Sequence, residues 1–295
     1  MDTKSETYFH LAILASLGIN EVATPSNNIK LRALISRFGS FEETYNSLKP
    51  IFSNSLESKL VKSHQEIQED STGYGMLVCG QNDFPKQLTD RKTAPVLYYR
   101  GNPELLKKER IAVVGTRKDL TPQENQEAVI MLNHIQKRGY VIVSGLARGC
   151  DTMGHKAGLS NGTIAVIADP VNDYYLKRNK ELMDEIVKNH LLISQFPIGL
   201  KNFFHPRYYH GTTLTRRNQT TVALTTKGVV VLKTSDNGGT QYAINAAKDL
   251  HKNLYALKCN FIPENTWTSG FNWVDYSICR GTKLEEQEEL KLKLE

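Results

Sequence analysis

The chain has 295 residues, a length typical of about two folded domains. Of these residues 40% are hydrophobic and 23% charged, a composition that excludes a disordered or fibrous protein. Lys and Arg number 37 against 31 Asp and Glu, so the net charge of +6 favours polyanionic partners without identifying one. The four cysteines lack zinc-binding spacing, the first residues lack a signal-peptide pattern, and no apolar run is long enough to span a membrane. We therefore expect a cytoplasmic protein without a structural metal.

The first 70 residues have a helical pattern. Leu11, Leu14 and Leu17 fall on one face of a helix, and a second helix is expected over 29–37. That helix ends at Gly39, which can adopt a left-handed conformation, and Ser40 can cap the helix that follows. We expect a small helical domain of the SAM or helix-hairpin-helix kind, used for packing or protein interaction rather than for direct contact with nucleic acid.

From residue 73 the pattern changes to extended segments, and after residue 102 apolar strands alternate with helical segments. Short, continuously apolar strands indicate a parallel sheet that is covered on both faces. The predicted fold class is therefore α/β, with a doubly wound, mostly parallel sheet preceded by the helical domain. Strands are expected at 111–114, 141–143, 164–167, 191–193, 229–232 and 254–257, and helices at 122–138, 151–159, 177–188 and 239–250.

Glycine-rich turns follow three of the predicted strands. In an open α/β sheet, ligands bind beyond the carboxyl ends of the strands, and glycines let backbone N–H groups approach an anion closely. Three such turns at one edge of the sheet, two of them with arginine, predict an anion-binding site. The turns are Gly115-Thr116-Arg117-Lys118, Ser144-Gly145-Leu146-Ala147-Arg148-Gly149 and Asp236-Asn237-Gly238-Gly239-Thr240.

Basic residues are concentrated in two segments, 91–118 and 201–227, and the second contains no acid. The second segment also contains aromatic residues, among them Phe203, Phe204 and Tyr208. Cations that bind phosphates and rings that stack on bases suit a groove for single-stranded nucleic acid. We expect residues 203–217 to form a long loop, one wall of such a groove, with Phe204 or Tyr208 stacked on a base. Alternatively, the phenylalanines anchor the core.

The common nucleotide-binding and catalytic patterns are missing. The dinucleotide fingerprint GxGxxG does not follow the first strand of the parallel sheet, and no GxxxxGK[ST] motif occurs. Cys150 and His155 do not face each other on a helix. Gln241 and Tyr242 follow Thr240 where a nucleotide-cleaving enzyme of this fold would carry a glutamate. We therefore expect no catalytic residues, no cofactor and no metal.

Several segments resemble the DNA-processing protein A (DprA/Smf) family over residues 8–258. They are IAVVGTRK, GYVIVSGLARGCDTMGHKAGL and NGTIAVIA, and the preceding NDFPKQLTDRKTAPVLYYRGN and ISRFGSFEETYNS are also similar to that family. The resemblance implies an extended Rossmann domain that binds single-stranded DNA, forms a homodimer and helps to load a RecA-type recombinase. It also implies a role in natural transformation and in the handling of incoming DNA.

The resemblance implies roles for individual residues in the three turns, and it places Arg217-Asn218 at the family's RN step before a helix. Two segments depart from the family pattern: Ala168-Asp169-Pro170 replaces a glycine-rich turn, and FFHPRYYHGTTLTRRN replaces a shorter F-P-x-R-N segment. The candidate nucleic-acid-binding residues are Gly115, Thr116, Arg117, Lys118, Ser144, Gly145, Arg148, Gly149, Phe204, Tyr208, Arg216, Arg217, Asn218, Gly238, Gly239 and Thr240.

The expected domain organisation has four parts. Residues 1–70 form the helical domain, 71–102 an extended lead-in, 103–260 the Rossmann-like domain and 261–295 a charged tail without a winged helix. The expected function is that of a single-stranded DNA-binding protein, not an enzyme, that presents DNA to a partner. The alternatives are a nucleotide sensor or nucleotide-processing enzyme on the same fold, with a role in phage defence, and a scaffold that recruits proteins.

Overall fold

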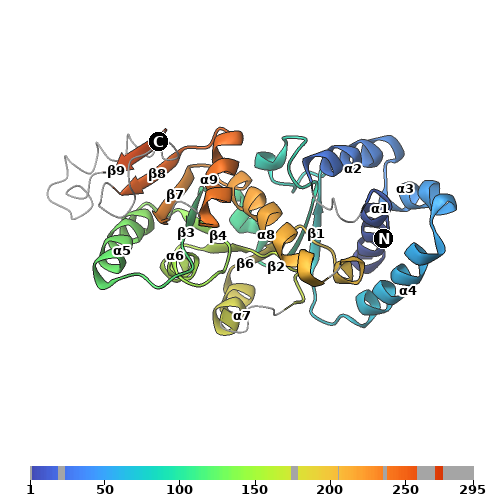
Figure 1. Cartoon of the computed structure of the whole chain (residues 1–295), viewed down its shortest axis with the longest axis horizontal. Coiled ribbons are helices and arrows are strands. Elements are labelled where there is room, and N and C mark those ends of the chain that lie inside the picture. The colour runs from blue at the N-terminus through green and yellow to red at the C-terminus, as the bar shows by residue number, and fades with distance from the viewer. Residues whose placement is uncertain are drawn as a thin grey trace. The chain divides into compact units, whose positions relative to one another are not determined.

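The computed structural model describes residues 2–18, 24–173, 179–204, 206–234, 238–257 and 270–274. Residues 236–237 of the third glycine-rich turn lie outside this part of the chain. Of the expected tail over 261–295, only residues 270–274 are described, and residues 271–274 form a strand. The helices are α1 (Thr3–Ser16), α2 (Pro25–Phe38), α3 (Phe41–Leu48), α4 (Asn54–Glu69), α5 (Pro122–Lys137), α6 (Cys150–Gly158), α7 (Lys180–Asn189), α8 (Pro206–Ala223) and α9 (Thr240–Asp249) (Figure 1). The strands are β1 (Gly75–Val78), β2 (Val96–Gly101), β3 (Arg110–Gly115), β4 (Val141–Ser144), β5 (Thr163–Val166), β6 (Leu191–Ser194), β7 (Gly228–Lys233), β8 (Leu254–Leu257) and β9 (Phe271–Val274).

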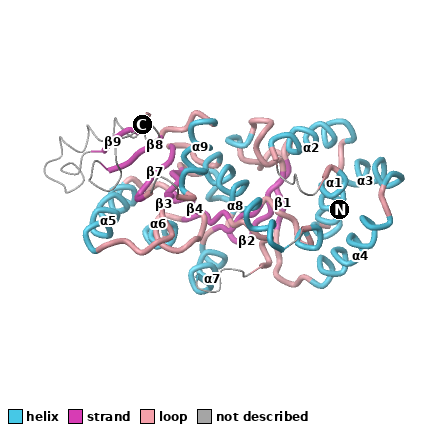
Figure 2. The backbone as a smooth tube through the Cα atoms, in the orientation of Figure 1, coloured by secondary structure: helices cyan, strands magenta, loops and turns pink. Residues whose placement is uncertain are grey.

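The strands form one sheet in the order β1-β2-β6-β5-β4-β3-β7-β8-β9 within the described residues (strands magenta in Figure 2). β1 and β2 pair antiparallel, whereas β3 pairs parallel with both β4 and β7. The pairs β4–β5, β7–β8 and β8–β9 are parallel as well. The fold class predicted from the sequence, a mostly parallel α/β sheet preceded by helices, is confirmed.

The chain divides into two compact units, each of which is built from several separate segments of the sequence. The first contains residues 1–100, 167–175 and 192–220, and the second contains residues 101–166, 176–191 and 221–295. The domain boundaries expected from the sequence stay a prediction. The three glycine-rich turns belong to the second unit, and residues 203–220 of the basic, aromatic segment belong to the first.

In the second unit, alternate residues of each central strand face different helices. Ile111 and Val113 pack with α5 residues in one core cluster, whereas Ala112 and Val114 pack with α9 residues in another. The same alternation in β7 sends Val230 to the first cluster and Val229 to the second. Because both faces of each strand are buried, the strands are apolar throughout, which is why they could be recognised in the sequence.

The first unit contains the N-terminal helices that the sequence predicted. Gly39 ends α2 with a φ of +80°, and the Ser40 hydroxyl accepts the N–H of Glu43 at 3.1 Å at the start of α3. His10 of α1 is buried, and its Nδ1 bonds to the hydroxyl of Tyr98 on β2 at 2.7 Å. Among the described residues, none of the helices has the length and apolarity that crossing a bilayer requires.

The expectation of a long loop over 203–217 is wrong. A short 3-10 turn, η6 (Leu200–Phe203), is followed almost directly by α8, so most of the segment is helical. One stripe of α8 is buried, and it consists of Tyr209, Thr213, Arg217 and Thr220, at helical spacing. Because most of this buried stripe is polar, the segment carries no hydrophobic periodicity, and its helix could not be seen in the sequence.

Candidate nucleic-acid interface

The first two glycine-rich turns meet at the carboxyl ends of β3, β4 and β7. The N–H of Thr116 donates to the carbonyl of Lys233 at the end of β7, at 2.9 Å. The carbonyl of Thr116 in turn accepts the N–H of Cys150 at 3.2 Å. The turn after β3 is therefore joined to the end of β7 and to the start of α6. We call residues 115–118 and 144–149 together the glycine-rich edge.

Glycine is required at two positions of this edge. A Cβ on Gly115 would lie 2.4 Å from the Sγ of Cys150. Gly149 has a φ of +73° and packs against the backbone of the first turn. The two glycines therefore allow the two turns to pack closely against each other. From the sequence alone, we expect these glycines instead to leave room for an anion.

Cationic side chains are exposed on the glycine-rich edge. Arg117 and Lys118 on the first turn and Arg148 on the second are all exposed. Arg148 Nη2 lies 3.5 Å from the carbonyl of Arg117, which places the second arginine beside the first turn. Exposed arginines beside one another can bind successive phosphates of a nucleic-acid backbone.

Two polar residues near the edge have structural partners. Ser144 is buried, and its hydroxyl donates to the carbonyl of Val113 at 2.6 Å, so this candidate side chain is held within the sheet. Lys233 forms an ion pair with Glu124 of α5. The hydrogen bond from Lys233 is the main cause that lowers the pKa of Glu124.

The third glycine-rich turn follows β7, which is a neighbour of β3. Gly238 is half-buried and Gly239, the N-cap of α9, is exposed, whereas Thr240 is buried. These residues contribute the N-terminal end of a helix, where backbone N–H groups favour an anion.

The remaining candidates lie in the first unit, on or just before α8. Phe204 is half-buried and makes an edge contact with the buried ring of Tyr209, with centroids 5.4 Å apart. The side chain of Tyr208 lies outside the described part of the chain. Arg216 and Asn218 are half-buried, whereas Arg217 is only 4% exposed. Burial lowers the pKa of Arg216.

Sequence reasoning missed an acid–base cluster in the first unit. The Nζ of Lys201 lies 3.2 Å from Oδ1 of Asp169 and also forms an ion pair with Asp173. His210 of α8 approaches the same Asp169 oxygen, with Nδ1 at 3.9 Å. Lys201 and His210 come from the basic segment and Asp169 from the turn that departs from the family pattern. Because two carboxylates face Lys201, this lysine is neutralised rather than offered to phosphate.

Burial opposes the charged form of both partners in this cluster. It raises the pKa of Asp169, although the charge of Lys201 acts in the opposite direction. Burial also disfavours the Lys201 ammonium, but the hydrogen bond to Asp173 and the charge of Asp169 raise its pKa overall. Lys201 was one of five cations in a segment without acids, and the acids that pair with it are distant in sequence.

A buried arginine also reduces the cationic surface expected from the sequence. Arg110, within the first basic segment, is 1% exposed, and its guanidinium donates to the carbonyls of Leu224 and Lys108, each at 2.7 Å. Burial lowers its pKa to about 10. Arg110 therefore joins the start of β3 to the chain just after α8 and is not part of the exposed edge.

Nucleophilic or metal chemistry has little support among the described residues. Cys150 is fully buried, and burial raises the pKa of its thiol to about 12, which removes the reactive thiolate at neutral pH. No group of three His, Cys, Asp or Glu side chains with metal-binding geometry occurs within the described ranges.

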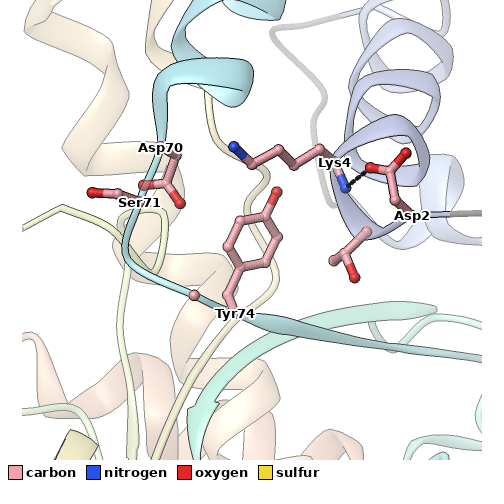
Figure 3. A pocket seen from close by; sticks show the side chains of 7 residues that line it. Asp2, Lys4, Asp70, Ser71 and Tyr74 are labelled. Atoms are coloured by element: carbon pink, nitrogen blue, oxygen red, sulfur yellow. Dashed lines mark hydrogen bonds between the residues drawn. The ribbon is translucent and has the colours of Figure 1, made fainter.

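A pocket in the first unit is lined by Asp2, Lys4, Asp70, Ser71 and Tyr74 together with two neighbours (Figure 3). Asp2 caps α1 by accepting the N–H of Lys4 at 2.9 Å, and Asp70 follows α4. None of the candidate nucleic-acid-binding residues lines this pocket.

Several curated proteins are similar to this chain over more than half of its length. DNA processing protein DprA of Streptococcus pneumoniae is 34% identical over 177 residues, which cover 59% of this chain and 59% of that protein. DNA processing protein DprA of Bacillus subtilis is 33% identical over 165 residues, or 55% of this chain and 52% of that protein. The chain therefore spans little more than half the length of these relatives.

Solved structures of the family have the same fold. The X-ray structure of DNA processing protein A from S. pneumoniae matches 86% of this chain and 81% of its own, with 25% identity and a TM-score of 0.61. DNA processing protein A from Helicobacter pylori matches 75% of this chain and 97% of its own, with 22% identity and a TM-score of 0.59. The second match shows the fold alone.

The family model of DNA recombination-mediator protein A matches residues 75–274. The matched segment begins with β1, ends with β9 and contains all three glycine-rich turns. It covers more than half of the sequence, and the chain therefore belongs to the DNA recombination-mediator protein A family.

Proposed function

We propose that this protein binds single-stranded DNA through the glycine-rich edge and catalyses no reaction on it. The observation that carries the proposal is the exposure of Arg117, Lys118 and Arg148 on two joined turns at the carboxyl ends of parallel strands. Family membership supports it, because relatives are named DNA processing proteins. The H. pylori protein of the same fold is described by its single-stranded DNA binding mode.

The three cations would bind phosphates, and the N-terminus of α9 at Gly238, Gly239 and Thr240 would add backbone N–H groups. Arg216, Arg217 and Asn218 remain candidates on α8, although the burial of Arg217 favours a structural role for that side chain. Stacking of Phe204 or Tyr208 on a base stays a prediction.

The partners that we propose for this protein are inferred from its family, because its fold alone does not identify them. As a DNA recombination-mediator, the protein would form a homodimer and present the bound strand to a RecA-type recombinase during the handling of incoming DNA. The absence of catalysis is proposed because the buried thiol of Cys150 is not activated and the described residues contain no group of three His, Cys, Asp or Glu side chains that could hold a metal ion.

A binding titration tests the proposal. The full chain is titrated with labelled oligothymidine, with a duplex of the same length and with a mononucleotide, at several salt concentrations. We expect tight binding of the single strand with a steep salt dependence, because phosphate contacts release counterions. Saturation by the mononucleotide with little salt dependence would instead indicate a nucleotide sensor. If neither the oligothymidine nor the mononucleotide binds, single-stranded DNA binding and nucleotide sensing are both rejected.

A further inference from the structure

We propose that His155 is a positioning residue, which fixes the turn 144–149 so that Arg148 is presented to the bound strand. This inference rests on the proposed function, because it concerns how one of the phosphate-binding side chains is held. His155 is fully buried on α6, which is labelled in Figure 1, so its side chain is not exposed to a bound strand. It acts through the backbone of Leu146.

Both backbone polar groups of Leu146 are bound by side chains. The Nε2 atom of His155 accepts the N–H of Leu146 at 3.2 Å. The side-chain amide of Asn179 donates to the Leu146 carbonyl at 2.8 Å. Leu146 therefore has no free backbone group with which to bind a phosphate.

The same is true of Ala147. Its N–H donates to Oδ2 of Asp151 at 3.3 Å, and its carbonyl accepts the hydroxyl of Thr152 at 2.7 Å. The middle of this turn is thus held entirely by side chains of α6 and by Asn179. The turn offers an anion the exposed side chain of Arg148, whereas the N–H groups of Leu146 and Ala147 are already bound.

The hydrogen bonds of His155 define its tautomer. The hydroxyl of Thr163 donates to the carbonyl of Ile142 at 2.9 Å, so it is an acceptor towards Nδ1 of His155, which lies 2.7 Å away. Nδ1 therefore carries the proton, and Nε2 offers its lone pair to Leu146. Thr163 thereby fixes the orientation of the ring that accepts from the turn.

Leu146 needs the hydrogen bond to Nε2 of His155 because its backbone conformation is unfavourable. Its φ is +60°, and its side chain is fully buried. A residue other than glycine keeps a left-handed conformation only when its surroundings enforce it. Release of the Leu146 N–H would let the turn relax, and Arg148, two residues further, would change direction.

Two variants of His155 test whether the hydrogen bond accepted by Nε2 matters more than the hydrogen bond made by Nδ1. His155→Gln places an amide oxygen near the position of Nε2 and can still accept the Leu146 N–H. His155→Asn places its amide near Nδ1, keeps the bond to Thr163 and loses the acceptor. Each variant loses one of the two hydrogen bonds, so the thermal midpoints of both should fall by similar amounts.

Hydrogen exchange of the Leu146 amide and the affinity for labelled oligothymidine are then measured in wild type, both variants and Arg148→Ala. We expect His155→Asn to lose Leu146 protection and to weaken binding about tenfold, the effect of losing one charged hydrogen bond. His155→Gln should retain protection and affinity. Because His155 acts through Arg148, adding His155→Asn to Arg148→Ala should weaken binding no further.

The outcomes that would overturn the proposal are distinct. Equal Leu146 protection in the Asn and Gln variants would show that Nε2 does not hold the turn. Additive losses in the double variant would show that His155 does not act through Arg148. Wild-type affinity of Arg148→Ala would reject the phosphate contact, and with it the presenting role of His155. Failure of the wild type to bind the oligonucleotide would reject the proposed function, while the exchange data would still decide whether Nε2 holds Leu146.

Discussion

Gly149 lies directly against Thr116: a Cβ atom on Gly149 would stand 2.4 Å from the carbonyl oxygen of Thr116. The contact is between two backbones, so no side-chain rotation can relieve it. It brings the turn that follows β4 onto the turn that follows β3, and it thereby places Arg148 beside Arg117. The spacing of the two arginines depends on the absence of a side chain at Gly149.

Gly149→Ala should therefore destabilise the protein more than Gly139→Ala. The two glycines have almost the same φ, +73° and +72°, but nothing lies within 4 Å of a Cβ at Gly139. The Gly139 variant should lose about 1–2 kcal/mol from left-handed strain alone. The Gly149 variant should lose at least about 1 kcal/mol more, because the backbone must move. Urea unfolding measures both, and equal losses would contradict the contact.

Arg117→Ala and Arg148→Ala should each weaken the binding of all single-stranded sequences by a similar factor. Phosphate contacts carry no base information, and each lost contact should reduce the salt slope for a single strand by about 0.7. Arg37→Ala, which removes an exposed arginine of α2, controls for the change in net charge. An unchanged salt slope in the folded double variant would remove these arginines from the DNA site.

Tyr209→Phe should leave stability unchanged or raise it. The Tyr209 side chain is buried, its hydroxyl has no hydrogen-bond partner among the described residues, and burial raises the pKa of the phenol. Removing an unpaired buried hydroxyl avoids a desolvation cost of about 1–3 kcal/mol. Tyr98→Phe is the matched control and should be destabilising, because it leaves Nδ1 of His10 without its 2.7 Å partner. Similar free energies of unfolding for the two variants would contradict this difference.

Stability should fall as the pH is lowered from neutrality, with His10 as one cause. Burial lowers the pKa of His10 to about 3, whereas an unfolded histidine titrates near 6.5. Between these values the unfolded chain binds the proton and the folded chain does not, so the stabilisation is complete above pH 6.5 and is lost towards pH 3. The contribution of His10 is about 1.4 kcal/mol per pH unit in this window.

His10→Gln removes this titration and should flatten the dependence of unfolding free energy on pH, although it lowers stability at pH 7. His134 provides an independent comparison, because burial lowers its pKa to about 4 as well. His134→Gln should flatten the curve over a slightly narrower range. If neither substitution changes the slope, these histidines do not control acid stability.

The strands from β3 to β8, and the glycine-rich turns that follow β3, β4 and β7, could be predicted from the sequence, whereas β9 lies where a tail was expected. β3, β4 and β7 are buried on both faces, so their apolar runs are continuous, and the glycines that follow are local signals as well. Because parallel strands end at a common edge, the meeting of the turns after β3 and β4 could be inferred from their order alone. The exposure of Arg117, Lys118 and Arg148 agrees with that inference.

Which polar residues are buried inside the protein depends on contacts between distant parts of the chain. Three such cases leave no periodic pattern in the sequence. They are the pairing of Lys201 with Asp169, the burial of Arg110 and Arg217, and the hydrogen bond that Nε2 of His155 accepts from the Leu146 N–H. The polar stripe of α8 hid a helix for the same reason. Hydrophobic patterns report burial only where burial removes apolar surface from water. A buried polar group is instead stabilised by a particular partner, which the folded chain brings from a distant position.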